Sequence, residues 1–287
     1  MSQPTVSDVV VAMLHAYGIK TIFGLISTSI LDLFDALARD GGIRLIPTQH
    51  EQGAAFMADG YARVTGKPGV LLISIGPGST NALTGVAQAY HESSPVVVLC
   101  SEATSHVHGR GRSNFHEVDQ VALFRPITKW AVRAERAERV PELLRRAFQV
   151  AVSGRPGPVY LGLPKDFLLA PAPALDVSAL DPVAPTRVQA DGEAIDRALS
   201  LLLEARHPFI LAGGGVLWSG ARDALRRLAQ RLAAPVAATP WHRGIIPDDH
   251  PLGVGQLGNT GTRAALELAA EADLLLVVGS TLSELTT

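Results

Sequence analysis

Short apolar runs rich in β-branched residues alternate with longer amphipathic stretches through the first part of this chain. The apolar runs, bounded by turn-forming residues, predict strands at 20–24, 43–47, 69–76, 95–101 and 157–164. Stretches with apolar positions at helical spacing lie between them, at 6–17, 51–65, 80–91 and 138–153. Continuous apolar strands separated by helices are typical of a mostly parallel sheet covered on both faces. The pattern predicts an α/β fold with a doubly wound, mostly parallel sheet.

The alternation is interrupted at residues 168–190, where Pro, Ala and Asp dominate without regular periodicity. This composition predicts an extended linker, so we place a first domain at 1–170, a linker at 171–190 and a second domain at 191–287. The α/β pattern then resumes, with helices expected at 192–205, 219–233 and 261–271 and strands at 208–214, 235–239 and 273–280. Because the sequence stops soon after a strand, we expect this second, Rossmann-like domain to be incomplete.

Charge and composition narrow the range of partners. The chain carries 25 Lys and Arg against 27 Asp and Glu without a terminal block of one sign, which argues against nucleic acid. No apolar run approaches the ~18 residues of a membrane span, and the N-terminus lacks the basic leader of a signal peptide. A single cysteine, Cys100, excludes an internal disulfide and is typical of a reducing compartment. We expect a cytoplasmic protein that binds small molecules or other protein chains.

A glycine-containing turn, SIGPGSTNALTG at 74–85, is the first candidate for ligand binding. A strand leads through Gly76 and Gly78 into a helix that Ser79 or Thr80 can cap. The N–H groups of such a turn lie at the carboxyl edge of the sheet, where open α/β folds bind ligands. An ordinary tight turn with a good cap explains the same residues.

Other candidate sites have weaker patterns. A second glycine cluster, LAGGGVLWSGA at 211–221, could hold a nucleotide diphosphate such as that of FAD. However, no acidic residue ends a strand about twenty residues further on, as ribose binding requires, and a structural turn is the alternative. His106, His108 and His116 share a polar loop but lack recognised metal-ligand spacing, so we expect no metal site. The sequence contains no GxSxG elbow, so a serine hydrolase is not indicated.

Glu51 begins an expected helix whose following positions are mostly small or apolar. At helical spacing, four small residues share its face: Ala54, Ala55, Ala58 and Ala62. A flat ligand or another backbone can approach such a face closely, and we expect a domain or subunit contact across it. The alternative is that Glu51 is a solvated first-turn acid that stabilises the helix by a few tenths of a kcal/mol.

Five long blocks resemble the thiamine-diphosphate enzymes, in the order and spacing of the acetolactate synthase and benzoylformate decarboxylase group. They lie at 23–37, 50–70, 74–99, 115–130 and 155–166. The region 191–287 is similar to the middle domain of that family through AGGGV, IIPDDHPLGVGQLG and ADLLLVVGS. The family's C-terminal Gly-Asp-Gly motif is absent, so the resemblance implies that diphosphate and Mg²⁺ ligands come from beyond Thr287 or from another polypeptide.

The resemblance assigns roles to particular residues. It implies that Glu51 is the catalytic glutamate, whose carboxyl bonds the aminopyrimidine of thiamine diphosphate and promotes proton removal from the thiazolium. It places a cofactor-binding turn at Gly76, Pro77, Gly78 and Asn81. It further implies decarboxylation of a small 2-oxo acid, carboligation, or both. Because family members build this site between subunits, at least a homodimer or a complementary subunit is expected.

The substrate side departs from the acetolactate synthase pattern. The resemblance places Phe115, His116 and Lys129 beside the substrate, with His116 in place of the usual glutamine. Where a Pro-Gly-Gly loop is typical, this chain has Ile26 followed by Ser27 and Thr28, which would place bulkier walls and two hydroxyls near the substrate. These changes favour a 2-oxo acid or acceptor other than that of acetolactate synthesis. A non-catalytic scaffold subunit and a nucleotide-binding protein remain as alternatives.

Overall fold

The computed structural model describes residues 3–111, 114–173, 176 and 188–286. The chain divides into two compact units, Met1–Thr186 and Arg187–Thr287. Most of the expected linker, 171–190, lies outside the described residues. At its start, Pro171 pairs with Thr5 and the Ala172 N–H donates to the Pro4 carbonyl at 2.9 Å, so this segment packs on the first unit.

A six-stranded sheet forms the first unit, in the order β2-β1-β3-β4-β6-β5, and every neighbouring pair is parallel. Its strands are β1 (Thr21–Gly24), β2 (Arg44–Pro47), β3 (Gly69–Ile73), β4 (Val96–Glu102), β5 (Trp130–Arg133) and β6 (Val159–Pro164). The predicted α/β class and doubly wound parallel sheet are confirmed. The hydrophobic pattern missed β5, because the apolar run of this half-buried edge strand is only three residues long.

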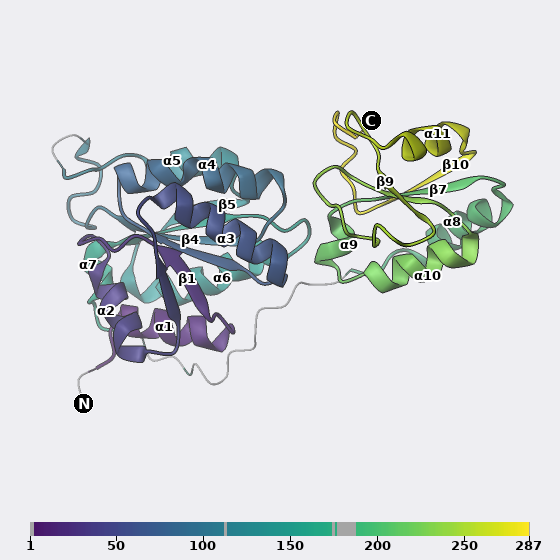
Figure 1. Ribbon diagram of the computed structural model, residues 1–287. Helices are drawn as coiled ribbons and strands as arrows, with labels where there is room; N and C mark the ends of the chain where they lie inside the picture. The colour runs from purple at the N-terminus through teal and green to yellow at the C-terminus, as the bar shows by residue number, and fades with distance from the viewer. Residues whose placement is uncertain (1–2, 112–113, 174–175, 177–187, 287) are drawn as a thin grey trace. The chain divides into compact units, whose positions relative to one another are not determined.

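Helices cover both faces of this sheet (Figure 1). One face carries α1 (Val6–Ala16), α2 (Leu31–Asp40), α6 (Val140–Val152) and α7 (Lys165–Leu168). The other carries α3 (Glu51–Thr65), α4 (Pro77–His91) and α5 (Gln120–Phe124). Two short 3-10 helices lie at Arg125–Ile127 and Ala137–Arg139. Each face has its own apolar core, and the central strands β3 and β4 are buried throughout.

The alanine face of α3 overturns one expectation. Its four alanines are at most 1% exposed and pack within the first unit. A side chain added at Gly85 of α4 would place its Cβ only 2.5 Å from the Ala55 Cβ, and one at Gly69 of β3 would come 2.2 Å from the Ala58 carbonyl. The small side chains therefore let α3, α4 and β3 of the same unit approach closely. A contact with another domain or subunit does not lie across this face.

The order of the strands reverses between β1 and β3. The chain passes from β1 to β2 on one side of this point and from β3 to β4 on the other. In open parallel sheets such a reversal leaves a crevice outside the carboxyl ends of the two strands, and ligands bind there. The loop that follows β1 and the turn that follows β3 border this position.

The second unit contains a parallel sheet in the order β10-β7-β8-β9. Its strands are β7 (Pro208–Ala212), β8 (Val236–Ala238), β9 (Gly253–Gln256) and β10 (Leu274–Val278), and its helices are α8 (Gly192–Glu204), α9 (Gly215–Trp218), α10 (Arg222–Leu232) and α11 (Arg263–Glu271). Helices α9 and α10 share a core with β7 and β8, while α11 packs beside Phe209 and Ala237. Within the described residues, no helix has the length and apolar character needed to cross a bilayer.

Candidate functional site

Glu51 lies at the carboxyl edge of the first sheet, where the N-termini of α3 and α4 meet. The side chain is buried, with 5% of the residue exposed, so the alternative of a solvated first-turn acid is wrong. The Asn81 amide of α4 donates to Glu51 Oε2 at 3.0 Å. Glu51 Oε1 faces Gly78, where a Cβ would stand 2.8 Å away. The absence of a side chain at Gly78 therefore lets the first turn of α4 approach this oxygen closely.

The turn between β3 and α4 is held by its neighbours. Gly76 has φ +66° and ψ −117°, a conformation that glycine adopts readily, and its N–H donates to Gln120 Oε1 at 2.7 Å. Helix α4 begins at Pro77, whose fixed φ suits a first helical position. The expected cap by Ser79 or Thr80 is wrong: each hydroxyl donates back to a carbonyl of the turn, at Gly76 and Pro77.

The loop after β1 reaches the same edge through a series of hydroxyl groups. The half-buried Ser27 places its Oγ 3.2 Å from Ser29 Oγ, which lies 2.7 Å from Ser101 Oγ. Ser101 Oγ in turn accepts from the Ile75 N–H at 2.8 Å. Thr28 is exposed at the same loop. The two hydroxyls predicted on the substrate side therefore lie on a loop that is bonded to the β3–α4 turn.

His116 lies against Gly76, and Phe115 stacks on the His116 ring. Their rings stack with centroids 3.7 Å apart, and Phe115 is 71% exposed. His116 adopts φ +57°, uncommon for a residue with a side chain. A Cβ at Gly76 would come 2.4 Å from the His116 carbonyl oxygen, so the glycine permits this loop to rest on the turn.

Lys129 does not join these residues. It precedes β5 and therefore lies at the amino edge of the sheet, opposite the Gly76 turn. Its ammonium group donates to the carbonyls of Val150 and Ser153, at 2.5 and 2.6 Å, around the C-terminus of α6. Burial lowers the pKa of Lys129. The structure thus gives Lys129 a helix-capping contact in place of the expected position on the substrate side.

Three buried polar residues behind the turn were missed by sequence reasoning. Gln120 donates to the Tyr160 hydroxyl at 2.7 Å and to the Ser101 carbonyl at 3.0 Å, and Tyr160 donates to Glu102 at 2.6 Å. Burial raises the pKa of Glu102, and it raises that of Tyr160 far above its usual range. For Glu102 and Tyr160, a polar group in an otherwise apolar strand was the available signal, because buried polar groups require partners.

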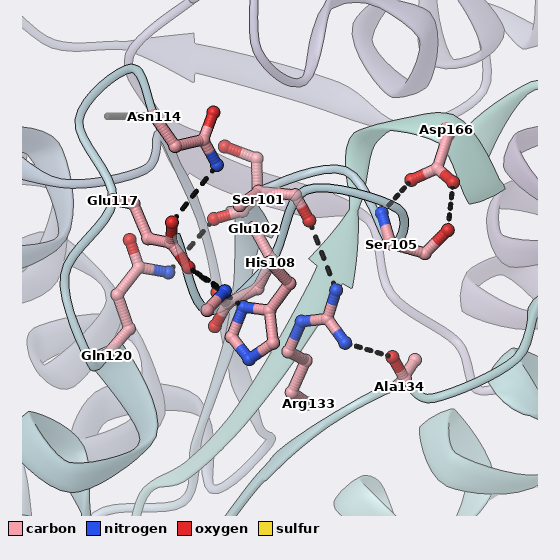
Figure 2. A network of polar contacts seen from close by, with 12 residues as sticks. Ser101, Glu102, Ser105, His108, Asn114, Glu117, Gln120, Arg133, Ala134 and Asp166 are labelled. Carbon is pink, nitrogen blue, oxygen red and sulfur yellow. Dashed lines mark hydrogen bonds and ion pairs between the residues drawn. The ribbon is translucent and has the colours of Figure 1, made fainter. Parts of the chain in front are cut away.

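The carboxylate of Glu117 connects parts of the loop that follows β4 (Figure 2). Glu117 accepts hydrogen bonds from the Gly109 N–H and Asn114 and lies 3.2 Å from His108 Nδ1. Burial raises the pKa of Glu117, but these contacts outweigh it and hold the pKa below its ordinary value. Across the described part of the chain, no three His, Cys, Asp or Glu side chains lie close enough together to hold a metal ion.

The glycine cluster of the second unit is filled by the chain itself. A Cβ at Gly213 would come 2.5 Å from the Gly279 carbonyl oxygen, and the Gly215 N–H donates to that same oxygen at 2.9 Å. A Cβ at Gly214 would come 2.4 Å from His242 Nε2. Close packing between the end of β7 and the end of β10 accounts for these glycines, in agreement with a structural turn.

Fold and site together define a class: an α/β protein with a buried carboxylate beside a glycine turn at the strand-order reversal of a parallel sheet. The family model for the N-terminal TPP-binding domain of thiamine pyrophosphate enzymes matches residues 4–123, and that for their central domain matches residues 195–287. The chain therefore belongs to the thiamine pyrophosphate enzymes, whose cofactor is also called thiamine diphosphate. The predicted resemblance is confirmed.

Curated relatives agree with this family. The chain is 40% identical over 286 residues to a probable acetolactate synthase large subunit of Methanocaldococcus jannaschii, covering 97% of this chain and 47% of the relative. It is 42% identical over 281 residues to a probable 2-ketoarginine decarboxylase of Pseudomonas aeruginosa, with coverages of 98% and 49%. It is 38% identical over 276 residues to a sulfoacetaldehyde acetyltransferase of Alcaligenes xylosoxydans xylosoxydans, with coverages of 96% and 45%. The chain spans about half the length of these relatives.

Proposed function

We propose that this chain is the part of a thiamine-diphosphate-dependent 2-oxo acid decarboxylase or carboligase that activates the cofactor, with Glu51 as the catalytic residue. The observation that carries the proposal is the buried carboxylate of Glu51, bonded by Asn81 beside the glycine turn at the carboxyl edge of the sheet. A carboxyl oriented by Asn81 and shielded from water is suited to bonding a ring nitrogen of a heteroaromatic cofactor.

The residues present fit the aminopyrimidine half of the cofactor. Gly76 and Gly78 let the backbone of the turn lie close to the His116 loop and to Glu51, and a Cβ at either glycine would clash there. When bound, the cofactor supplies an electron sink for cleavage beside the carbonyl of a 2-oxo acid. In this proposal Glu51 holds and moves the proton at the aminopyrimidine nitrogen, and Asn81 keeps its carboxyl in place.

The substrate would lie on the side of the two loops that border the turn. Ser27, Thr28 and His116 offer hydroxyl and imidazole groups, while the exposed Phe115 ring offers an apolar wall. These groups favour a 2-oxo acid with a polar side chain, or a polar acceptor. The name of one relative, a probable 2-ketoarginine decarboxylase, supports testing such substrates.

The remainder of the site is proposed to come from elsewhere. The described residues hold no metal-ligand cluster, and the relatives are about twice as long as the matched region. We propose that the diphosphate and Mg²⁺ are bound by the corresponding other half of such proteins, and that the active form is at least a dimer in the cytoplasm. Sedimentation of the full-length protein tests the oligomeric state.

The decisive experiment replaces the carboxyl of Glu51 by an amide in the full-length protein. For Glu51→Gln we expect kcat for CO₂ release from a panel of 2-oxo acids to fall by about 10²–10⁴, the usual contribution of a positioned acid or base. Glu193→Gln is the matched control, because Glu193 also lies in the first turn of a helix but its side chain is 91% exposed.

Full activity of the Glu51→Gln protein would overturn the assignment of the catalytic residue. Calorimetry of thiamine diphosphate with Mg²⁺ addresses the alternative of a scaffold subunit. If the wild-type full-length protein binds no cofactor, alone or with a candidate partner, the scaffold function replaces the enzymatic one.

A further inference from the structure

A chain of buried hydrogen bonds behind the Gly76 turn takes no direct part in the function proposed above. The Tyr160 hydroxyl donates to Glu102 Oε1 at 2.6 Å, Gln120 Nε2 donates to the Tyr160 hydroxyl at 2.7 Å, and the Gly76 N–H donates to Gln120 Oε1 at 2.7 Å. Glu102, Tyr160 and Gln120 are 4%, 0% and 1% exposed. The chain connects the centre of the sheet to the backbone that borders Glu51.

The donor and acceptor groups set the direction of these bonds. The Gln120 amide nitrogen can only donate, so the Tyr160 hydroxyl oxygen accepts from it and the single hydroxyl proton is directed to Glu102 Oε1. The Ser101 carbonyl also accepts from Gln120 Nε2, at 3.0 Å. Both contacts turn the amide nitrogen inward, which leaves the amide oxygen facing the Gly76 N–H.

The sheet makes room for this polar chain at a structural cost. Gly162 of β6 has no side chain, and a Cβ there would stand 2.6 Å from Glu102 Oε1. Desolvated polar groups inside a core are costly unless every partner is present, and apolar residues would fill the same volume without that requirement. The series of hydrogen bonds therefore fixes one arrangement of its groups. The last group in the series is the N–H of Gly76, which has φ +66°.

We propose that Gln120 is a positioning residue for the cofactor-facing turn, and that Tyr160 and Glu102 fix the orientation of its amide. By holding Gly76, Gln120 sets where α4 begins, and so where Gly78 and Asn81 stand relative to Glu51. The identity of the ligand in this inference rests on the proposed function, whereas the hold on Gly76 does not.

The test compares Tyr160→Phe and Gln120→Met with a matched control, Thr128→Val. Thr128 is also buried, and its hydroxyl donates to the Phe124 carbonyl at the end of α5, at 2.8 Å. This bond does not belong to the series of hydrogen bonds from Glu102 to Gly76. Hydrogen exchange of the ligand-free full-length protein, followed by mass spectrometry on peptides covering 74–80, reports the Gly76 amide. We expect the Gly76 amide to exchange at least about tenfold faster in Tyr160→Phe and Gln120→Met than in the wild type, and at the wild-type rate in Thr128→Val.

Cofactor binding supplies the second readout. In Tyr160→Phe and Gln120→Met the turn loses the support of one hydrogen bond. We expect thiamine diphosphate with Mg²⁺ to bind these variants about five- to tenfold more weakly in calorimetry. Glu102→Gln retains an acceptor for the Tyr160 hydroxyl, so we expect its Gly76 exchange and cofactor affinity to stay close to wild type. Exchange in the core strand β3, followed in the same experiment, should be unchanged in every variant.

The outcomes separate this inference from the proposed function. Unchanged Gly76 exchange in Tyr160→Phe and Gln120→Met overturns the hold on the turn. Faster Gly76 exchange with undiminished cofactor affinity overturns the positioning role. Absence of cofactor binding by the wild-type protein overturns the proposed function and the positioning role together, and the exchange comparison then decides only whether the chain holds Gly76.

Discussion

Replacing Gly78 by alanine tests the arrangement around Glu51 most directly. Gly78 lies in the first turn of α4, and a methyl group there would stand 2.8 Å from both Glu51 Oε1 and Ser74 Oγ, and 3.3 Å from Ser74 Cβ. Alanine gains about 1 kcal/mol in helix propensity over glycine. Forcing the methyl group into this contact costs about 1–3 kcal/mol. The free energy of unfolding should therefore fall by between zero and about 2 kcal/mol.

The effect of Gly78→Ala on the cofactor should be larger than its effect on stability. If the methyl group displaces the Glu51 carboxylate, a hydrogen bond to a charged group is lost, which is worth about 1.5–3 kcal/mol. Thiamine diphosphate binding should then weaken by about 10- to 150-fold in calorimetry with Mg²⁺. Urea unfolding, followed by circular dichroism, provides the stability on the same samples.

Gly60→Ala is the matched control for this experiment. Gly60 lies in the interior of α3 and a Cβ there meets no atom within 4 Å, so the variant should be more stable by about 1 kcal/mol and bind the cofactor unchanged. If Gly78→Ala and Gly60→Ala bind thiamine diphosphate equally well, the placement of the Glu51 carboxylate against Gly78 does not matter for cofactor binding, and the reasoning from Gly78 is refuted.

Three further substitutions test other parts of the structure. Lys129→Met should lower the free energy of unfolding by about 1–3 kcal/mol, because the α6 carbonyls lose their donor, and leave KM unchanged; a raised KM would return Lys129 to the substrate side. Burial raises the pKa of Glu102, so this group binds more protons in the native protein than in the unfolded chain, and its contribution to stability falls as pH rises above the ordinary glutamate pKa. Glu102→Gln should flatten that dependence in urea unfolding, whereas parallel curves would contradict a buried titrating carboxyl. Gly213→Ala should destabilise the second unit by about 1–3 kcal/mol through the Gly279 carbonyl without affecting the cofactor; weaker binding would revive a ligand role for this turn.

The hydrophobic pattern predicted those helices and strands in which apolar residues recur at a regular spacing. The helix expected at 51–65 is α3 with the same bounds, because its alanine face is buried on one side and a left-handed glycine, Gly66, follows its last residue. The apolar strands around Leu71 and Val98 were found for the same reason. The helix expected from 80 instead begins at Pro77, since the local rule favoured a hydroxyl cap while Gly76 and Pro77 supply the start.

Residues whose role depends on the direction of a strand were harder to predict. Lys129 belongs to a block that resembles the family, but only the pairing of β5 with β6 shows that it stands at the amino edge of the sheet. The chain of Glu102, Tyr160 and Gln120 joins three elements that are distant in sequence, and no local spacing brings them together. Periodicity also identified the alanine face without identifying what covers it, because any close neighbour satisfies the same pattern.

The burial of Cys100 has a practical consequence for future measurements. Its thiol lies within β4 without surface exposure, and burial raises its pKa far above the usual range, so it reacts slowly with alkylating probes at neutral pH. A cysteine introduced at an exposed position such as Thr28 or Phe115 would therefore be the reactive thiol of these 287 residues. A fluorophore attached there could follow movement of either loop in real time, with no need to remove the native cysteine first.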